Sequence, residues 1–482
     1  MIYIRNTGSQ PLYEQVYEGI KKDIMDGTLK KGTALMPIRK IAEELQVSRN
    51  TVSHAYQQLV SEGYLRAVRG SGYFVDDCPE TDEIYAVCRP QPVLQPVPKL
   101  RCDFRYESIS TQLFPWSKWQ KYVHQALLKE ECSEAISYAP NKGNDALREN
   151  LCIYLKTSRG VNCTPEQIVI CAGTQFGLQI IASLLPARQY LLAFEEPGYG
   201  GMKKVFALSK FAIEPIQVLD DGMDMDAVRQ KQCNLLYVTP SHQFPTGVVT
   251  SMEKRLEMLQ WAEENDAFII ENDYDNEFGY RTQRVPSIQA MDQNGRVTYI
   301  SMFTKVLSPS IWCAYFVLPK TLLPVYEKRY SFFNAALPTY HQVALADFIH
   351  DGLLDEHARE MSVISQRKYA LIEKCFAEEG EGVATLMGTP SGTHTLIRIP
   401  QCTDQDRLIA YLRAQGIGLY GTKEYWTDQS KAPDFDRPAG RAAYAKAVRP
   451  APGFGTGTVQ QRFYRGDNPG PHFQEVFGSH DD

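Results

Sequence analysis

The sequence has no apolar run as long as the roughly 18 residues that a bilayer-spanning helix requires. Its opening residues, MIYIRNTGSQPLYEQ, contain no apolar stretch like that of a secretory signal peptide. The 11 cysteines form no CxxC pair, which argues against a disulfide framework and against a zinc site. We therefore expect a cytoplasmic protein with reduced thiols, no membrane segment and no structural metal.

The chain also lacks an excess of positive charge, because 51 Lys and Arg residues stand against 57 Asp and Glu residues, a formal net charge of -6. This balance argues against a protein wrapped in nucleic acid, but it is compatible with a local basic face. At 482 residues and 43% hydrophobic content, the chain is too long for a single core. Two or more domains are expected.

Residues 11–75 have the pattern of a small DNA-binding domain. Apolar residues at helical spacing predict helices at 11–26, 38–45 and 48–62. Ser48 is a good N-cap for the third of these helices. Two short strands around a glycine-containing turn follow at 64–75. Two helices joined by a tight turn and followed by a β wing form a winged helix-turn-helix.

The third helix of this motif is the natural reader of the major groove, with its N-terminal side chains nearest the base edges. Arginine and asparagine there can make bidentate base contacts, whereas other basic residues contact phosphates and position the domain. The alternative is a small helical domain with an ordinary charged face. The candidate DNA-binding residues are Arg39, Lys40, Ser48, Arg49, Asn50, Thr51, His54 and Arg69.

From about residue 100, short apolar strands alternate with helical segments. This alternation predicts an α/β domain with a mainly parallel sheet, and such sheets bind ligands at the carboxyl ends of their strands. Residues 76–99, in front of this domain, are rich in proline and acidic residues. They are typical of a semi-extended linker.

Several of the predicted strand ends carry residues suited to a ligand. Gly173, Thr174 and Gln175 stand between a strand and a helix, where free N–H groups favour a phosphate; a plain turn is the alternative. Tyr199 follows a Pro-Gly pair and either stacks on a flat ring or packs within its turn. His242 lies in the loop TPSHQFPTG, residues 239–247, which two prolines and a glycine constrain.

Lys305 lies in a short turn between two apolar runs, 297–300 and 315–318, that predict neighbouring strands. One interpretation is a solvated surface amine, the usual state of a lysine. The other is an amine held in a dry pocket, ready to form an imine. Its neighbours along the chain leave both interpretations open.

Taken together, these segments resemble the MocR subfamily of GntR-type regulators over about residues 10–425. The resemblance rests on PLYEQVYEGIKKDI, SRNTVSHAYQQLVSEGYL and RGSGYFV in the first domain, and on TPSHQFPTG and YISMFTKVLSPSIWCAYFVLP in the second. It implies a winged helix fused to a domain similar to a fold-type I aminotransferase, which binds pyridoxal 5′-phosphate (PLP). It also implies a homodimer that binds operator DNA.

The resemblance assigns roles to single residues. Lys305 would carry the cofactor, with Ser308 in the turn that follows. The motif ENDY would place Asn272 or Asp273 at the ring nitrogen and Tyr274 at the phenolic oxygen. The implied domains are 1–76, the GntR-type winged helix; 77–99, the linker; 100–425, the aminotransferase class I/II-like domain; and 426–482, an atypical tail expected to be poorly ordered.

Three departures from the subfamily pattern bear on the site. Asn272 aligns with the carboxylate that holds the ring nitrogen, and Asp273 replaces it only if the strand end shifts. Trp312 stands in place of a phosphate-binding arginine, and Met302 in place of a hydroxyl residue. The tail, rich in Gly, Pro and Arg, offers Arg449 and Arg462 among others as effector-binding arginines, but no motif selects one.

The main hypothesis is a PLP-dependent transcriptional regulator that senses an amine or amino acid through aldimine exchange at Lys305. The second is an active aminotransferase with an attached DNA-binding domain. The third is an operator-binding dimer whose larger domain has lost PLP chemistry. The sequence alone does not select the operator, the effector, or activation over repression.

Overall fold

The computed structural model describes residues 11–76, 100–105, 113–128, 139–278, 285–379, 384–388, 392–399 and 404–427. The chain separates into two compact units, Met1–Val97 and Pro98–Asp482. The linker predicted at 77–99 and nearly all of the tail predicted at 426–482 lie outside the described residues. No helix in the described ranges is long and apolar enough to cross a membrane.

The first unit is a winged helix-turn-helix, as the sequence predicts. Its elements are α1 (Leu12–Met25), α2 (Ile38–Glu44), α3 (Arg49–Ser61), β1 (Leu65–Val68) and β2 (Gly72–Val75). The two strands pair antiparallel, from Leu65 opposite Val75 to Val68 opposite Gly72.

Two side-chain hydrogen bonds, one of them made by the predicted cap Ser48, fix the positions of α2 and α3. Ser48 caps α3, because its hydroxyl accepts the N–H of Thr51 at 3.1 Å. The fully buried Tyr56 donates its hydroxyl to the carbonyl of Met36 at 2.8 Å. That bond holds the chain just ahead of α2, whose N-cap residue Pro37 offers no side-chain hydrogen bond.

The second unit contains eight strands in one sheet, as expected for an α/β domain. The strands are β4 (Ile168–Ala172), β5 (Leu191–Glu196), β6 (Ala212–Leu219), β7 (Gly222–Met223), β8 (Leu235–Val238), β9 (Phe268–Asn272), β10 (Val297–Met302) and β11 (Cys313–Val317). Their order is β4-β11-β10-β9-β8-β5-β6-β7. The strands from β10 across to β6 run parallel, while β11 is antiparallel to both β10 and β4, and β7 is antiparallel to β6.

Helices pack on both faces of this sheet because its strands are apolar on both faces. On β11, Tyr315 belongs to a cluster with α7 and α14, whereas the next residue, Phe316, belongs to a cluster with α8. The helices are α5 (Trp116–Leu128), α7 (Asp145–Arg159), α8 (Gly173–Leu184), α9 (Gly200–Leu208), α10 (Met225–Gln230), α11 (Met252–Glu264), α12 (Ile288–Met291), α13 (Leu323–Tyr330) and α14 (Thr339–His350).

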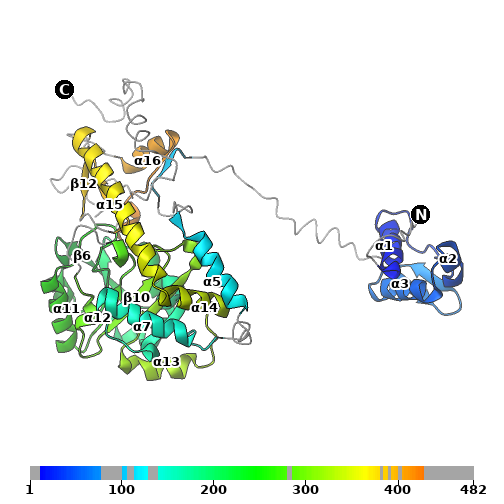
Figure 1. Cartoon of the computed structure of the whole chain (residues 1–482), viewed down its shortest axis with the longest axis horizontal. Coiled ribbons are helices and arrows are strands. Elements are labelled where there is room, and N and C mark those ends of the chain that lie inside the picture. Colours follow the sequence, from blue (N-terminus) through cyan, green and yellow to red (C-terminus); the bar gives the residue numbers. More distant parts are fainter. Residues whose placement is uncertain are drawn as a thin grey trace. The chain divides into compact units, whose positions relative to one another are not determined.

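A smaller lobe completes the unit. The long helix α15 (Leu353–Glu379) leads to it from the sheet domain (Figure 1). The lobe contains β12 (Thr385–Met387) paired with β13 (Leu396–Arg398), and β3 (Cys102–Asp103) paired with β14 (Ile417–Gly418) next to α16 (Gln405–Ala414). Short 3-10 turns occur elsewhere, at η2 (Pro165–Gln167), η3 (Ala187–Gln189), η4 (Asn276–Phe278), η5 (Pro309–Ile311), η6 (Lys320–Leu322) and η7 (Lys423–Tyr425).

Candidate functional site

A hollow of about 60 Å³ opens at the carboxyl ends of the parallel strands. The strands β5, β8, β9 and β10 each end in it, because parallel strands bring their carboxyl ends to one edge of the sheet. The hollow is lined by Thr174, Phe194, Glu195, Tyr199, Met202, Tyr237, Thr239, Phe244, Asn272, Tyr274 and Met302. Of the residues predicted to bind a cofactor, Thr174, Tyr199, Asn272 and Tyr274 are among them.

Lys305 lies in the turn between β10 and β11, which pair as neighbouring strands from Tyr299 opposite Val317 to Met302 opposite Ala314. Only 5% of its surface is exposed, so the interpretation as a solvated surface amine is wrong. The residue lies three positions after Met302, which lines the hollow. Lys305 itself is not among the residues that line the hollow, so the structure places it buried in the turn that follows the lining strand β10.

Two adjacent polar residues at the end of β9, Asn272 and Asp273, point their side chains in different directions. Asn272 faces the hollow, and its amide donates to the hydroxyl of Tyr237 at 2.7 Å. Its other amide atom, Oδ1, is buried and has no hydrogen-bond partner among the described residues. An acceptor is thus left facing the hollow.

Asp273 does not face the hollow, so the structure does not bring it to the predicted ring-nitrogen position. Its carboxylate is fully buried and accepts Arg159 Nε at 2.7 Å and the hydroxyl of Tyr299 at 2.8 Å. The strand end is not shifted, because the N–H of Asp273 continues the ladder by bonding to the carbonyl of Ile300 at 2.9 Å. Sequence reasoning missed Arg159, which lies more than a hundred residues from its partner.

Tyr274 and Tyr199 line the hollow in different ways. The hydroxyl of Tyr274 donates to the carbonyl of His242 at 2.8 Å, which ties β9 to the loop 239–247. Tyr199 is 41% exposed and meets Phe244 edge to face, with ring centroids 5.6 Å apart. Its ring thus lies at the rim of the hollow, and stacking on a flat ligand stays a prediction.

His242 lies beside the hollow and not among its lining residues. Its Nδ1 is 3.0 Å from Asp275 Oδ2, and its ring centroid is 4.3 Å from that of His394. The ligand atoms of these three buried residues lie within 4.8 Å of one another, a grouping that could hold a metal ion. The sequence had given no indication of it, since the three residues come from separate segments. The cofactor contact predicted for His242 stays a prediction.

The start of α8 carries the predicted phosphate-binding residues. Gly173 and Thr174 are buried there, while Gln175 is exposed. The N-cap residue Ala172 makes no side-chain hydrogen bond, and the hydroxyl of Thr174 donates to Met302 Sδ at 3.1 Å. Thr174 thus points into the hollow, but its hydroxyl is bonded to a thioether.

Ser308 is placed away from the hollow. Its hydroxyl caps η5 by accepting the N–H of Ser310 at 3.2 Å. The same hydroxyl lies 2.8 Å from the hydroxyl of Ser310. Its role in the structure is to shape the turn that leads to Trp312.

Glu195 is a lining residue that sequence reasoning missed. Its carboxyl accepts the hydroxyl of Thr239 at 2.6 Å and the N–H of the same residue at 3.1 Å. Burial raises the pKa of Glu195 to about 7, against hydrogen bonds that favour the charged form. The signal was the EEPGYGG segment at the end of β5, but only the fold shows which glutamate turns inward.

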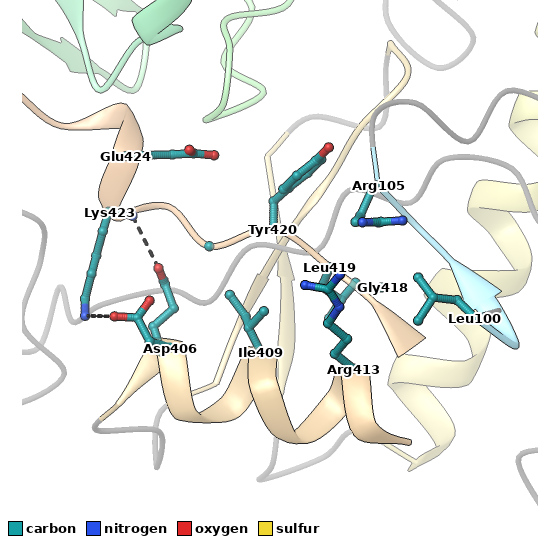
Figure 2. A pocket seen from close by; sticks show the side chains of 12 residues that line it. Leu100, Arg105, Asp406, Ile409, Arg413, Gly418, Leu419, Tyr420, Lys423 and Glu424 are labelled. Atoms are coloured by element: carbon teal, nitrogen blue, oxygen red, sulfur yellow. Dashed lines mark hydrogen bonds and ion pairs between the residues drawn. The ribbon is translucent and has the colours of Figure 1, made fainter. Parts of the chain in front are cut away.

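A second cavity, of about 440 Å³, lies in the smaller lobe between α16, β14 and β3. Figure 2 shows Arg105 and Arg413 on its wall, and the ion pair of Lys423 with Asp406 at 2.7 Å. Arg105 is itself paired with Asp103 at 2.8 Å. The tail arginines considered for effector binding lie outside the described residues.

The first unit presents the predicted DNA-contacting residues at its surface. Thr51 is half-buried and its hydroxyl lies 2.8 Å from that of Ser48, so these two residues serve the cap of α3. Arg39 pairs with Glu43 at 3.3 Å, and His54 contacts the ring of Tyr13 edge to face at 4.7 Å. The remaining candidates are exposed: Lys40, Arg49, Asn50 and Arg69.

Comparison with known proteins agrees with both units. Residues 12–75 match the family model for bacterial regulatory proteins of the gntR family, and residues 113–407 match that for aminotransferase class I and II. The chain is 34% identical to the uncharacterized HTH-type transcriptional regulator YdeL of Bacillus subtilis, covering 87% of this chain and 90% of the relative. It is 31% identical to the probable rhizopine catabolism regulatory protein MocR of Rhizobium meliloti, covering 87% and 88%.

Among solved structures, an archaeal alanine:glyoxylate aminotransferase matches with a TM-score of 0.66 at 22% identity, covering 73% of this chain and 87% of that chain. Identity at this level establishes the fold of the larger unit and nothing about its substrate.

Proposed function

We propose, for a chain that belongs to the MocR subfamily of GntR-type transcriptional regulators, that its larger unit holds PLP on Lys305 and senses an amine or amino acid there. The observation that carries the proposal is the burial of Lys305, 5% exposed, at the turn beside the strand-end hollow. A primary amine in such a place is a nucleophile that can form an imine with an aldehyde.

The part of the hollow lined by Asn272 and Tyr199, here called its ring end, has groups that suit the ring of a pyridine aldehyde. The unpartnered Asn272 Oδ1 can accept the N–H of a protonated ring nitrogen, and the half-exposed Tyr199 can stack on the ring. When bound, PLP would supply an aldehyde carbon that primary amines attack. In this arrangement Asn272 orients the ring, Tyr199 covers it, and Lys305 provides the attachment.

The same residues favour sensing over transamination. A working aminotransferase keeps its ring nitrogen protonated with a carboxylate, and the carboxylate nearest in sequence, Asp273, is bonded to Arg159 on the other side of the strand. A neutral amide holds that proton weakly. An amine effector would instead act by binding one arrangement of the protein better than another, which is the only way a ligand shifts such an equilibrium.

The test is attachment of the cofactor to one side chain. Incubation with PLP followed by borohydride should leave a pyridoxyl group on Lys305, found by mass spectrometry of peptides, together with absorbance from bound PLP before reduction. Lys305→Ala should lose both signals, whereas Lys320→Ala, at an exposed lysine in η6, should keep them. A wild-type protein that, after incubation with PLP and removal of the free cofactor, shows no absorbance from bound PLP and no pyridoxyl group on Lys305 would refute the proposal.

We further propose that the protein acts as a cytoplasmic homodimer on operator DNA. Support comes from the family match of the winged helix and from the resemblance to dimeric fold-type I proteins. Light scattering of the purified protein at micromolar concentration should give twice the chain mass. A monomeric mass with intact operator binding would count against the dimer.

A further inference from the structure

The start of α8 is the place in the hollow where an anion would bind. The helix is 12 residues long, and its N-cap residue Ala172 makes no side-chain hydrogen bond to the first-turn N–H groups. Such uncapped N–H groups and the helix dipole favour a phosphate. The side chains around this end decide whether one can approach.

Trp312 lies against this helix end. Two of its ring atoms, Nε1 and Cε2, lie 3.1 Å from the point that a Cβ on Gly173 would occupy. Its backbone has a φ of +48°, in the left-handed region, directly after η5. That conformation costs a non-glycine residue energy, so the turn holds the indole where it is. An indole offers one N–H and no charge, and it covers apolar surface.

Met302 occupies the other side. It lines the hollow, and its Sδ accepts the hydroxyl of Thr174 at 3.1 Å. That hydroxyl belongs to the first turn of α8, and it is bonded to a thioether. A phosphate arriving here would have to displace both the indole and the thioether.

Among the described residues, no cationic side chain in the lining of the hollow compensates for these two apolar side chains. None of the residues that line the hollow is Arg or Lys, and one of them, Glu195, is a carboxyl. The buried guanidinium of Arg159 is bonded to Asp273 and to Ser241 at 2.7 Å each. A dianionic phosphate that loses its water here gains no charge-assisted hydrogen bond in return.

We infer that Trp312 and Met302 remove phosphate recognition from this site, so that the hollow selects a pyridine aldehyde by its ring and by its bond to Lys305, with or without a phosphate. The inference rests on the proposed function and specifies its ligand class. The ring end fits such a ligand, whereas the phosphate end does not fit a phosphate. Trp312 and Met302 are specificity-determining residues in this scheme.

The experiment compares PLP with 5-deoxypyridoxal, which lacks the phosphate and cannot close to an internal hemiacetal. Dissociation constants of both aldehydes are measured by absorbance titration on the full-length wild type, Trp312→Arg, Met302→Ser and the matched control Trp312→Phe. The wild type and Trp312→Phe should bind the two aldehydes within about fivefold of each other. Trp312→Arg should favour PLP by about 10- to 100-fold, the range of one or two charge-assisted hydrogen bonds, and leave deoxypyridoxal unchanged.

The outcomes separate the two proposals. A wild type that prefers PLP over deoxypyridoxal by 100-fold or more overturns the inference and leaves PLP sensing intact. If neither aldehyde becomes attached to Lys305 in the wild type, in Trp312→Arg or in Met302→Ser, the proposed function itself is overturned. The ratio of the two dissociation constants on the wild type decides the inference alone, so the inference stays testable if Trp312→Arg fails to fold. Met302→Ser should also increase the preference for PLP, which is an independent test.

Discussion

Asn272 and Asp273 are adjacent in the chain, yet their side chains reach opposite faces of the sheet. Asn272 donates to Tyr237 in the hollow, and Asp273 accepts from Arg159 and Tyr299 on the other side. Side chains alternate along a strand, so a shift of one position would exchange them. The ladder bond from Asp273 to Ile300 prevents that shift. The residue that faces the hollow is therefore a neutral amide.

Replacing Asn272 with Asp should restore the carboxylate. We expect Asn272→Asp to bind PLP about tenfold more tightly, because a carboxylate interacts more strongly than an amide with a protonated ring nitrogen. Without ligand the variant should melt at a lower temperature, since its new charge is buried. Absorbance titration and thermal unfolding measure the two effects. Asn272→Ala is the control, and equal affinity in the wild type and Asn272→Asp would show that this position does not contact the ring.

Glu277 should make stability depend on pH. It is buried, one oxygen accepts Tyr154 at 3.3 Å, and the other has no hydrogen-bond partner among the described residues. Burial, with the negative charges of Asp273 and Asp275, raises the pKa of Glu277 to about 8. The folded state thus binds a proton that the unfolded state releases near pH 4.5, so the free energy of unfolding falls as pH rises from about 4.5 to 8.

Glu277→Gln, which is neutral at every pH, should flatten this decline. The difference between variant and wild type should grow to a few kcal/mol by pH 8.5, on the order expected for a shift of this size, and vanish near pH 4.5. Chemical denaturation at both pH values measures it. The control is Glu253→Gln at an exposed position of α11. Parallel pH curves for wild type and Glu277→Gln would contradict the assignment.

At the level of elements, α2 and α3 present different kinds of candidate DNA-binding residue. Arg49 and Asn50 are exposed in the first turn of α3, and Lys40 is exposed on α2. The capped end of α3 therefore presents residues that can reach base edges, while α2 presents a charge suited to the backbone.

Two substitutions should separate these contributions on an operator obtained by selection from random DNA. Arg49→Ala should lose about 1–3 kcal/mol on the selected site and little on other DNA, because it removes a base contact. Lys40→Ala should weaken binding to all sequences alike and reduce the slope of log affinity against log salt by about 1. Fluorescence anisotropy at several salt concentrations measures both. Equal losses on selected and random DNA for Arg49→Ala would place it on the backbone.

On the scale of the whole molecule, the chain has separate cores. Val16, Val52 and Leu59 belong to the core of the first unit, whereas the sheet domain has three clusters of its own. Because each unit has its own hydrophobic core, we expect the two units to unfold independently.

Calorimetry of the full chain should show two transitions, and PLP should move only one of them. A ligand that binds only the folded state at a hundredfold excess over its dissociation constant stabilises the unit that holds it by about 2.7 kcal/mol. The transition of the winged helix should stay where it is. Operator DNA should do the reverse. A single transition that both ligands shift would show that the units unfold as one.

The sequence by itself determined the elements and much of the chemistry. Helical spacing, the Ser48 cap and the glycine turn predicted the winged helix, and the alternation of strands and helices predicted the α/β unit, because these depend on neighbours within a few residues. The lysine turn between two strands was also predicted from local composition.

Tertiary structure alone decided what each site residue faces. In the folded chain Lys305 is buried, Asp273 bonds to Arg159, and Asn272 faces the hollow. His242 bonds to Asp275, and Trp312 lies against the start of α8. These contacts join segments that are far apart in the chain. Packing and strand register set them, and no local pattern carries that information.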